Sequence, residues 1–201
     1  MATNAILATA SYDHTIKFWN AATGTCTQTV QHKESQVCSA RLRLLTLRFI
    51  HNAAITNRGN LYVWNLVGAV APTQDTESFY RSSRVVPKKK LLAHERYGLK
   101  CRFSPDSTLL ATTSADETAR LWRTADFSEQ TVLAARNSER HKWIWDCAFT
   151  NDSRNLFTCS SDNMMRLWNL ESNQMVRQFV GHQRAITAMT FRDGATSAPV
   201  S

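Results

Sequence analysis

The sequence lacks the patterns of several common protein classes. Its five cysteines include no C-x-x-C pair, which argues against a zinc ribbon and a disulfide framework. Its longest uncharged run, Gly59 to Gln74, has 16 residues and several polar side chains, so it is too short and too polar to span a bilayer. We expect no secretory leader, because the N-terminal apolar stretch is brief and has no basic residues before it, and the sequence contains no nucleophile elbow, phosphate-binding loop or H-E-x-x-H motif. We therefore expect a cytoplasmic protein with reduced, buried thiols, and no membrane insertion, metal, cofactor or catalytic residue.

The charge of the chain is concentrated in two segments. The 201 residues are 43% hydrophobic and 20% charged, as in a globular domain, with a net charge of +8. Residues 81–102 hold eight basic side chains against one acidic one, and residues 38–58 hold four basic side chains and no acidic one. No aromatic residue interleaves with Lys88–Lys90, as a nucleic-acid stacking surface requires. We therefore predict a solvated loop over residues 67–90, and no nucleic-acid partner.

The chain contains an internal repeat. Cys101–Trp122 and Cys147–Trp168 align without gaps and are identical at 11 of 22 positions. In both, Ser precedes Asp by two residues and Asp precedes Trp by six, and Ile6–Trp19 has the same spacing. The residues concerned are Ser114, Asp116 and Trp122, then Ser160, Asp162 and Trp168, then Ser11, Asp13 and Trp19. Three matches to one spacing indicate a repeat architecture.

Each repeat has the pattern of short β-strands. Leu99, Cys101 and Phe103 alternate with polar residues, and the runs Leu109–Thr113 and Thr118–Trp122 flank a turn. No stretch has a sustained helical period. A period of about 40–45 residues with four strands and a terminal Trp is typical of a WD-repeat propeller blade. We predict an all-β WD-repeat β-propeller with about four blades.

Similarity to WD repeats implies a hydrogen-bonded tetrad of His, Ser or Thr, Asp and Trp within each blade. The complete predicted set is His94, Ser114, Asp116 and Trp122. A second set is Ser160, Asp162 and Trp168, with Arg140 at the His position, and a third joins His182 to Ser11, Asp13 and Trp19. Because the trio of Ser, His and Asp recurs in every repeat, it suits a structural network better than a hydrolase site.

The two ends of the chain are complementary. Gly181–Phe191 begins a repeat, and the first repeat lacks that part. We expect the C-terminal strand to pair with the N-terminal blade and close the ring, which removes exposed sheet edges, with an open arc as the alternative. The predicted blades are residues 6–30 with 182–191, residues 32–93, residues 94–136 and residues 141–180.

The order of the segments is more specific than any single repeat. Ile6–Val37, Gly59–Leu66, Arg102–Thr124, Trp143–Leu170 and Gly181–Phe191 together resemble the WD-repeat, G-protein β-subunit-like subunits of target-of-rapamycin kinase complexes. That family has seven blades, so this chain resembles a form lacking about three of them. Residues 38–52 have no counterpart in the family and make 32–93 a hybrid blade. We expect that blade to be the least stable, because the other repeats have Asp six residues before Trp, whereas Arg58 stands six residues before Trp64.

The resemblance implies a non-catalytic scaffold. Such a subunit binds and stabilises the target-of-rapamycin kinase domain in both complexes, and supports signalling in growth control and in regulation of the actin cytoskeleton. The implied partners are the kinase domain and the other subunits, with no small-molecule substrate, and the contact residues are not assigned by sequence. The alternatives are another WD-repeat adaptor, of ubiquitin-ligase or chromatin type, and a non-functional truncated isoform.

Overall fold

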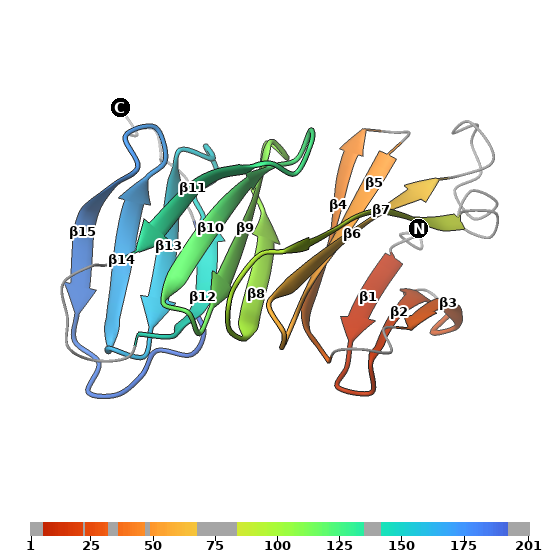
Figure 1. Cartoon of the computed structure of the whole chain (residues 1–201), viewed down its shortest axis with the longest axis horizontal. Helices are drawn as coiled ribbons and strands as arrows, with labels where there is room; N and C mark the ends of the chain where they lie inside the picture. Colours follow the sequence, from red (N-terminus) through yellow and green to blue (C-terminus); the bar gives the residue numbers. More distant parts are fainter. Residues whose placement is uncertain are drawn as a thin grey trace, which may run out of the picture.

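The computed structural model describes residues 6–21, 23–31, 36–46, 49–67, 84–134 and 142–192, which form β-strands and no helix (Figure 1). A three-stranded sheet, β1-β2-β3, is followed by three four-stranded sheets, β4-β5-β6-β7, β8-β9-β10-β11 and β12-β13-β14-β15. All neighbouring strands are antiparallel. The predicted all-β fold of WD-repeat blades is confirmed, and the described part has no helix that could cross a membrane.

Each sheet is built from consecutive strands of five to ten residues. The first sheet contains β1 (Ile6–Ala10), β2 (Thr15–Asn20) and β3 (Cys26–Gln31), and the second contains β4 (Val37–Thr46), β5 (Phe49–Thr56), β6 (Asn60–Val67) and β7 (Arg84–Leu92). The third contains β8 (Gly98–Phe103), β9 (Leu109–Ser114), β10 (Thr118–Arg123) and β11 (Glu129–Ala134). The fourth contains β12 (Ile144–Phe149), β13 (Asn155–Ser160), β14 (Met164–Asn169) and β15 (Gln174–Val180).

The Ser-x-Asp spacing of the repeats forms the tight turn between two strands. In the β9–β10 hairpin the Asp116 amide donates to Ser114 Oγ at 3.0 Å, and Asp116 Oδ1 accepts from the Thr118 amide at 3.1 Å. Glu117 lies between Asp116 and Thr118 and has a φ of 71°, in the left-handed region. The two hydrogen bonds to side-chain oxygens stabilise this conformation. The hairpins at Asp13 and Asp162 repeat these bonds. The spacing is therefore first of all a turn signal.

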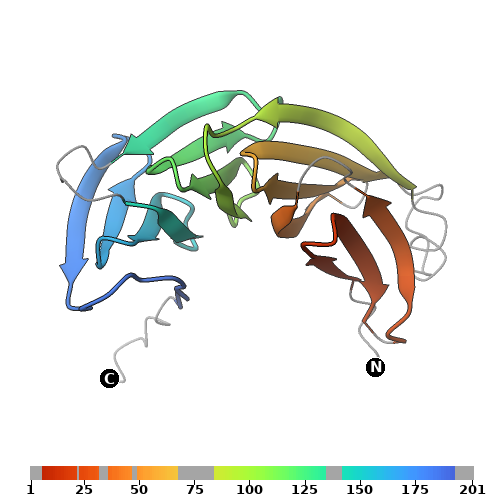
Figure 2. The same ribbon diagram turned by 60° about the horizontal axis from the view of Figure 1, so that its bottom comes forward.

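Hydrophobic contacts join the sheets side by side. One cluster, which includes Phe18 and Trp64, lies between the first and second sheets. A second, which includes Val63 and Trp122, joins the second and third sheets, and a third, which includes Leu121, joins the third and fourth. The sheets follow one another along a curve, as blades do in a propeller (Figure 2).

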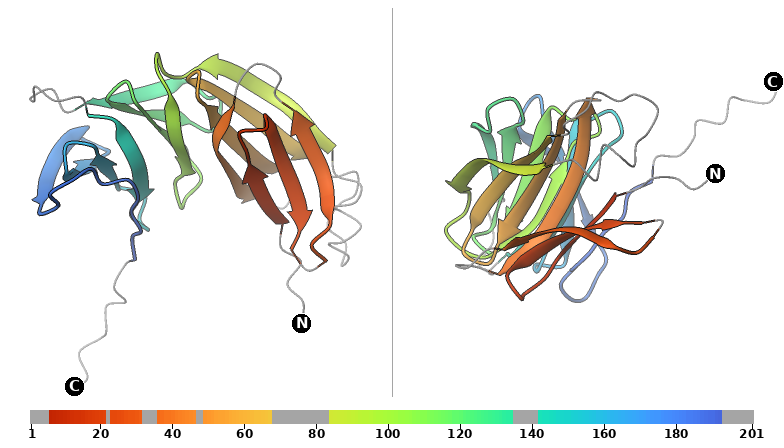
Figure 3. Two further views of the ribbon diagram at one scale, coloured as in Figure 1. Left: turned by 90° about the horizontal axis from the view of Figure 1, so that it is seen from below. Right: turned by 90° about the vertical axis from the view of Figure 1, so that its right-hand side faces the viewer.

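The curve is an open arc and not a closed ring. β1 and the last described segment lie at opposite ends of it (Figures 2 and 3). Within the described residues β1 pairs with β2 alone, and Gly181–Phe191 is not a strand of any sheet. The expected pairing of the C-terminal strand with the N-terminal blade is therefore absent, and the alternative of an open arc is observed. The physical reason is that the segment packs on the fourth sheet instead, where the Ile186 amide donates to the Ser160 carbonyl at 3.2 Å.

The basic stretch before residue 92 is a strand and not a loop. Residues 84–90, which we expected within the loop 67–90, belong to β7 at the outer edge of the second sheet. Lys89 Nζ donates to the Asp126 carbonyl at 2.6 Å, while Lys88 and Lys90 lie over the rings of Phe127 and Tyr62. The lysines thus connect β7 to its own sheet and to the next one. Residues 68–83 of the expected loop lie outside the described residues.

The second sheet departs from the others at one buried position. Trp19, Trp122 and Trp168 lie opposite Leu7, Leu110 and Leu156, whereas Trp64 lies opposite Asn52. Asn52 is 2% exposed, and among the described residues neither its amide oxygen nor its amide nitrogen has a hydrogen-bond partner. A buried amide without partners destabilises the fold, because it loses its hydrogen bonds to water.

Replacing Asn52 with Leu is therefore expected to raise the free energy of unfolding by about 1–2 kcal/mol. The change removes the unpartnered amide and restores the residue that the other three sheets have at this position. Urea denaturation followed by tryptophan fluorescence measures the effect. The control Asn52→Ala removes the amide without filling its space, so its gain should be smaller. A less stable Asn52→Leu variant would contradict this account of the sheet.

Candidate functional site

The predicted tetrad of the third sheet is a buried network with one unexpected member. His94 Nδ1 donates to Asp116 Oδ2 at 2.9 Å, and because a carboxylate only accepts, this nitrogen carries the proton. His94 Nε2 lies 2.8 Å from Thr112 Oγ1, which also accepts from Trp122 Nε1 at 2.9 Å. Thr112 therefore links His94 to Trp122. Ser114, which we had predicted for that role, instead accepts the Asp116 amide in the turn.

The fourth sheet replaces His with Arg in its network. Trp168 Nε1 donates to Thr158 Oγ1 at 2.9 Å, which repeats the Trp–Thr bond of the third sheet. Asp162 accepts hydrogen bonds from Ser160 Oγ and from both terminal nitrogens of Arg166. The bond from Arg166 Nη1 is 3.2 Å long. Arg166 and Asp162 are 6% and 5% exposed. Arg140, which strict register put at the His position, lies outside the described residues. Sequence reasoning missed Arg166, although the same alignment pairs it with Arg120.

The first sheet has the Trp–Thr bond, but among the described residues no His side chain joins its network. Trp19 Nε1 donates to Thr9 Oγ1 at 2.7 Å, and Asp13 Oδ1 accepts from the amide and hydroxyl of Thr15. Ser11 Oγ accepts the Asp13 amide at 3.2 Å. His182, which we expected to complete this set, is exposed, and the segment Gly181–Phe191 that contains it lies at the opposite end of the arc (Figure 2). The structure therefore does not bring it to these residues.

The carboxylates of the third-sheet and fourth-sheet networks are held in their charged form. Burial opposes the charge of Asp116, yet hydrogen bonds from His94 and Thr118 outweigh it and keep its pKa well below the usual range. Burial likewise opposes the charge of Asp162, and the bonds from Arg166 and Ser160 lower its pKa. A general acid or base needs a pKa near the working pH, so these carboxylates suit a structural role.

The cysteines show no sign of reactivity where they are buried. Cys101, Cys147 and Cys159 are buried thiols that form no disulfide with one another. Burial raises the pKa of the Cys147 thiol, and it raises the pKa of Cys159 to about 11, so both stay protonated at neutral pH. Cys26 corrects the expectation of buried thiols, because it is exposed on β3 at the edge of the first sheet.

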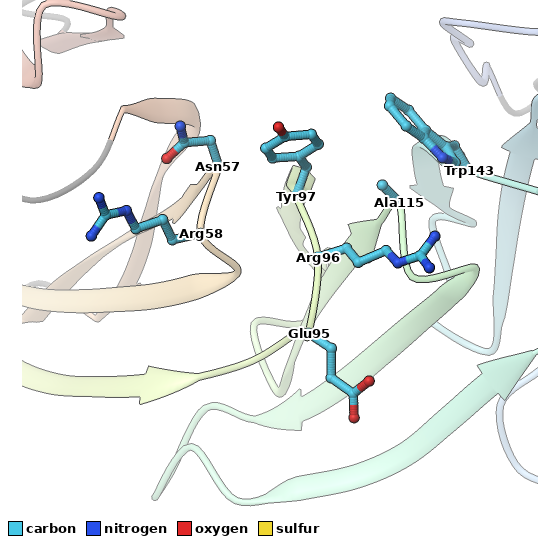
Figure 4. A pocket seen from close by; sticks show the side chains of 7 residues that line it. All are labelled: Asn57, Arg58, Glu95, Arg96, Tyr97, Ala115 and Trp143. Atoms are coloured by element: carbon cyan, nitrogen blue, oxygen red, sulfur yellow. The ribbon is translucent and has the colours of Figure 1, made fainter.

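A surface cavity lies where the ends of the second, third and fourth sheets meet (Figure 4). Its volume is about 340 Å³, and it is lined by Asn57 and Arg58 of the β5–β6 turn, Glu95, Arg96 and Tyr97 between β7 and β8, Ala115 of the β9–β10 turn, and Trp143 before β12. Tyr97 is 52% exposed and packs edge-on against Trp143, with ring centroids 6.1 Å apart. Trp143 in turn packs on Trp145 at 5.4 Å.

The chemistry of this cavity suits recognition of another protein. Exposed aromatic rings and Arg side chains are the residue types enriched where protein partners bind most strongly. Within the described ranges, no group of three or more His, Cys, Asp or Glu side chains could hold a metal ion. Sequence reasoning did not find the cavity, because its lining comes from four separate segments with no motif of their own.

Family comparison identifies the repeats. The family described as WD domain, G-beta repeat matches residues 2–20, 86–123 and 135–169. The last two matches cover most of the third and fourth sheets, and the first covers β1 and β2. The second sheet is matched only in β7.

Several similar curated proteins are named as subunits of one kind of complex. The chain is 45% identical over 182 residues to Target of rapamycin complex subunit LST8 of Mus musculus, covering 89% of this chain and 52% of that protein. It is 53% identical over 141 residues to Protein LST8 homolog of Drosophila pseudoobscura pseudoobscura, covering 70% of this chain and 41% of that protein. It is 44% identical over 137 residues to Target of rapamycin complex subunit wat1 of Schizosaccharomyces pombe, covering 68% of this chain and 40% of that protein.

The repeat spacing, the blade-like sheets and these similarities agree with one another. The chain spans about half the length of the curated relatives it matches. It contains WD repeats, and over most of its length it is similar to proteins named as subunits of target of rapamycin complexes.

Proposed function

We propose that the chain is a non-catalytic scaffold subunit that binds and stabilises the target of rapamycin kinase domain. The observation that carries the proposal is the 45% identity over 89% of the chain to a protein named as a subunit of that complex. A rigid set of blades with buried polar networks suits this role, since it holds a contact surface without catalysing a reaction. We further propose that the chain takes part in both complexes, in growth control and regulation of the actin cytoskeleton, and, because its sequence favours reduced thiols, that it acts in the cytoplasm.

The contact surface that we propose is the cavity of Tyr97, Trp143, Arg58 and Arg96. Tyr97 and Trp143 supply large rings that lose little conformational freedom on binding, and the two arginines favour an acidic or carbonyl-rich partner segment. Because three sheets contribute to the lining, the surface depends on the blades packing in their observed order.

Co-purification of the tagged chain with the kinase tests the proposal, beside a full-length relative as the positive standard. The double variant Tyr97→Ala, Trp143→Ala should weaken binding at least about tenfold, because aromatic anchors dominate such interfaces. Tyr12→Ala is the matched control, since Tyr12 is an exposed aromatic on the first sheet and outside the cavity. Thermal melting verifies that each variant is folded.

The outcomes separate the proposed role from its alternatives. A folded chain that does not bind the kinase, where the longer relative does, overturns the proposal and favours a non-functional isoform. Kinase binding that survives the double variant keeps the scaffold role but rules out this cavity as the contact surface. Recovery of ubiquitin-ligase or chromatin proteins in place of the kinase identifies a different WD-repeat adaptor.

A further inference from the structure

The first sheet lacks an inner strand beside β1 among the described residues, which leaves that edge open. In the third sheet the inner strand β8 pairs with β9, and the fourth sheet pairs β12 with β13 in the same way. β1 corresponds to β9 and β13, because Leu7 lies opposite Trp19 as Leu110 lies opposite Trp122. Among the described residues no strand takes the place of β8 beside β1. Such an edge presents unpaired amide and carbonyl groups, which accept another strand.

The chain contains a segment that matches the missing strand. Gly181–Phe191 aligns without gaps with Ala93–Phe103, the stretch that holds His94 and β8, and His, Arg and Phe recur at equivalent positions. By this alignment Ile186–Phe191 corresponds to β8. It already lies on the fourth sheet, with the Met189 amide donating to Asp146 Oδ2 at 3.2 Å and the Phe191 ring 5.1 Å from that of Phe157. It is thus positioned as the inner strand of a next blade.

The first sheet lacks the polar residue that the same segment carries. Thr9, Asp13 and Trp19 correspond to Thr112, Asp116 and Trp122, and the Trp–Thr bond is formed in both sheets. The third sheet has His94 in contact with Thr112 and Asp116, whereas the first has no equivalent within the described part. His182 stands where His94 stands in the alignment and is exposed. The open edge of β1 lacks a strand and the network of Thr9, Asp13 and Trp19 lacks a His. The segment Gly181–Phe191 could supply both.

The segment cannot reach β1 of its own chain from where it lies. The two are at opposite ends of the arc (Figure 3), and bringing them together would close four blades into a tight ring. The three hydrophobic clusters between the sheets would then have to repack, which close-packed interfaces resist. A second copy offers its β1 edge without any such change.

We propose that two copies of this chain exchange their C-terminal segments. Ile186–Phe191 of each copy pairs antiparallel with β1 of the other, and its His182 completes the network of Thr9, Asp13 and Trp19. A two-fold axis makes the two junctions identical and closes a ring of about eight blades, within the range of about four to eight that propellers adopt. This proposal is independent of kinase binding.

The register follows from the β8–β9 pairs. Phe103 lies opposite Leu110 and Cys101 lies opposite Thr112, so Phe191 is expected opposite Leu7, and Met189 opposite Thr9, of the other copy. Leu7 is 53% exposed at present. The Cα atoms of directly opposed residues lie about 4.5–5.5 Å apart, within the range of about 4.4–6.8 Å that a disulfide spans, whereas the neighbouring residue points to the opposite face.

Two measurements test the exchange. Sedimentation equilibrium of the unaltered chain should give twice the 22.8 kDa mass of one copy at micromolar concentration. In a background with Cys26→Ser and Cys38→Ser, the pair Leu7→Cys, Phe191→Cys should form a covalent dimer on mild oxidation. The matched control Leu7→Cys, Thr190→Cys shifts one cysteine by a single residue and should cross-link at least about tenfold less.

Each result decides the proposal. A dimer mass together with register-specific intermolecular disulfides supports it. A monomer mass for the folded, unaltered chain overturns it. A disulfide within one copy shows that the chain closes on itself and also overturns it, as does equal cross-linking by the two cysteine pairs.

Discussion

Replacing Arg166 with Met is expected to lower the free energy of unfolding by about 3–5 kcal/mol, since it leaves a buried carboxylate without its counter-charge. Asp162 is 5% exposed, and Arg166 is the charged residue that its oxygens contact in the fourth sheet. Met has a volume similar to that of Arg, so the lost stability comes from the missing charge and hydrogen bonds rather than from a cavity. Urea denaturation at neutral pH measures it, where Asp162 is ionised in the folded state.

Two further variants identify the cause of that loss. Arg120 occupies the same register position in the third sheet, but its partner Glu129 lies at the surface, and the two side chains are 23% and 38% exposed. Arg120→Met should therefore cost less than about 1 kcal/mol. Adding Asp162→Asn to Arg166→Met removes the unpaired charge and should recover most of the stability. If the Arg166 and Arg120 variants lose equal amounts, the buried ion pair has no special role.

Replacing Thr112 with Val is expected to cost about 2–4 kcal/mol, because it leaves two buried groups without partners. Val has nearly the shape of Thr, so packing is preserved and only the hydroxyl is lost. Trp122 Nε1 then has no acceptor, and His94 Nε2 loses its contact, in a region where His94 is 1% and Thr112 0% exposed. Thermal and urea denaturation report the loss of stability, and near-ultraviolet circular dichroism reports the environment of Trp122.

The matched control is Thr9→Val in the first sheet. Thr9 accepts the same kind of bond, from Trp19, but this pair is exposed in a single copy. At a protein concentration where the chain is monomeric, water can replace the hydroxyl and the cost should stay below about 0.5 kcal/mol. Ser114→Ala provides a second comparison, because Ser114 accepts one amide bond in the turn and should cost about 1 kcal/mol. A Ser114 effect larger than that of Thr112 would restore Ser114 as the central hydroxyl of the network.

Local spacing determined much of this protein. The Ser-x-Asp pairs predict turns, since their side-chain bonds span only two residues, and alternating runs such as Leu99–Phe103 predict strands. The residues Asp116, Trp122 and His94 of the network were also found by sequence. These features depend on neighbours in the chain or on a strong repeat, so a linear pattern is enough to reveal them.

Other features were decided by the tertiary structure alone. Thr112 and Ser114 point to the same face of β9, but Ser114 ends the strand and accepts the Asp116 amide in the turn, so Thr112 bridges His94 and Trp122. Arg166 replaces a histidine because its long side chain reaches Asp162 across the turn. The path of β7, the cavity around Tyr97 and the open arc depend on how whole sheets pack. Contacts between segments far apart in the chain decide all three, and such contacts leave no periodic trace in the sequence.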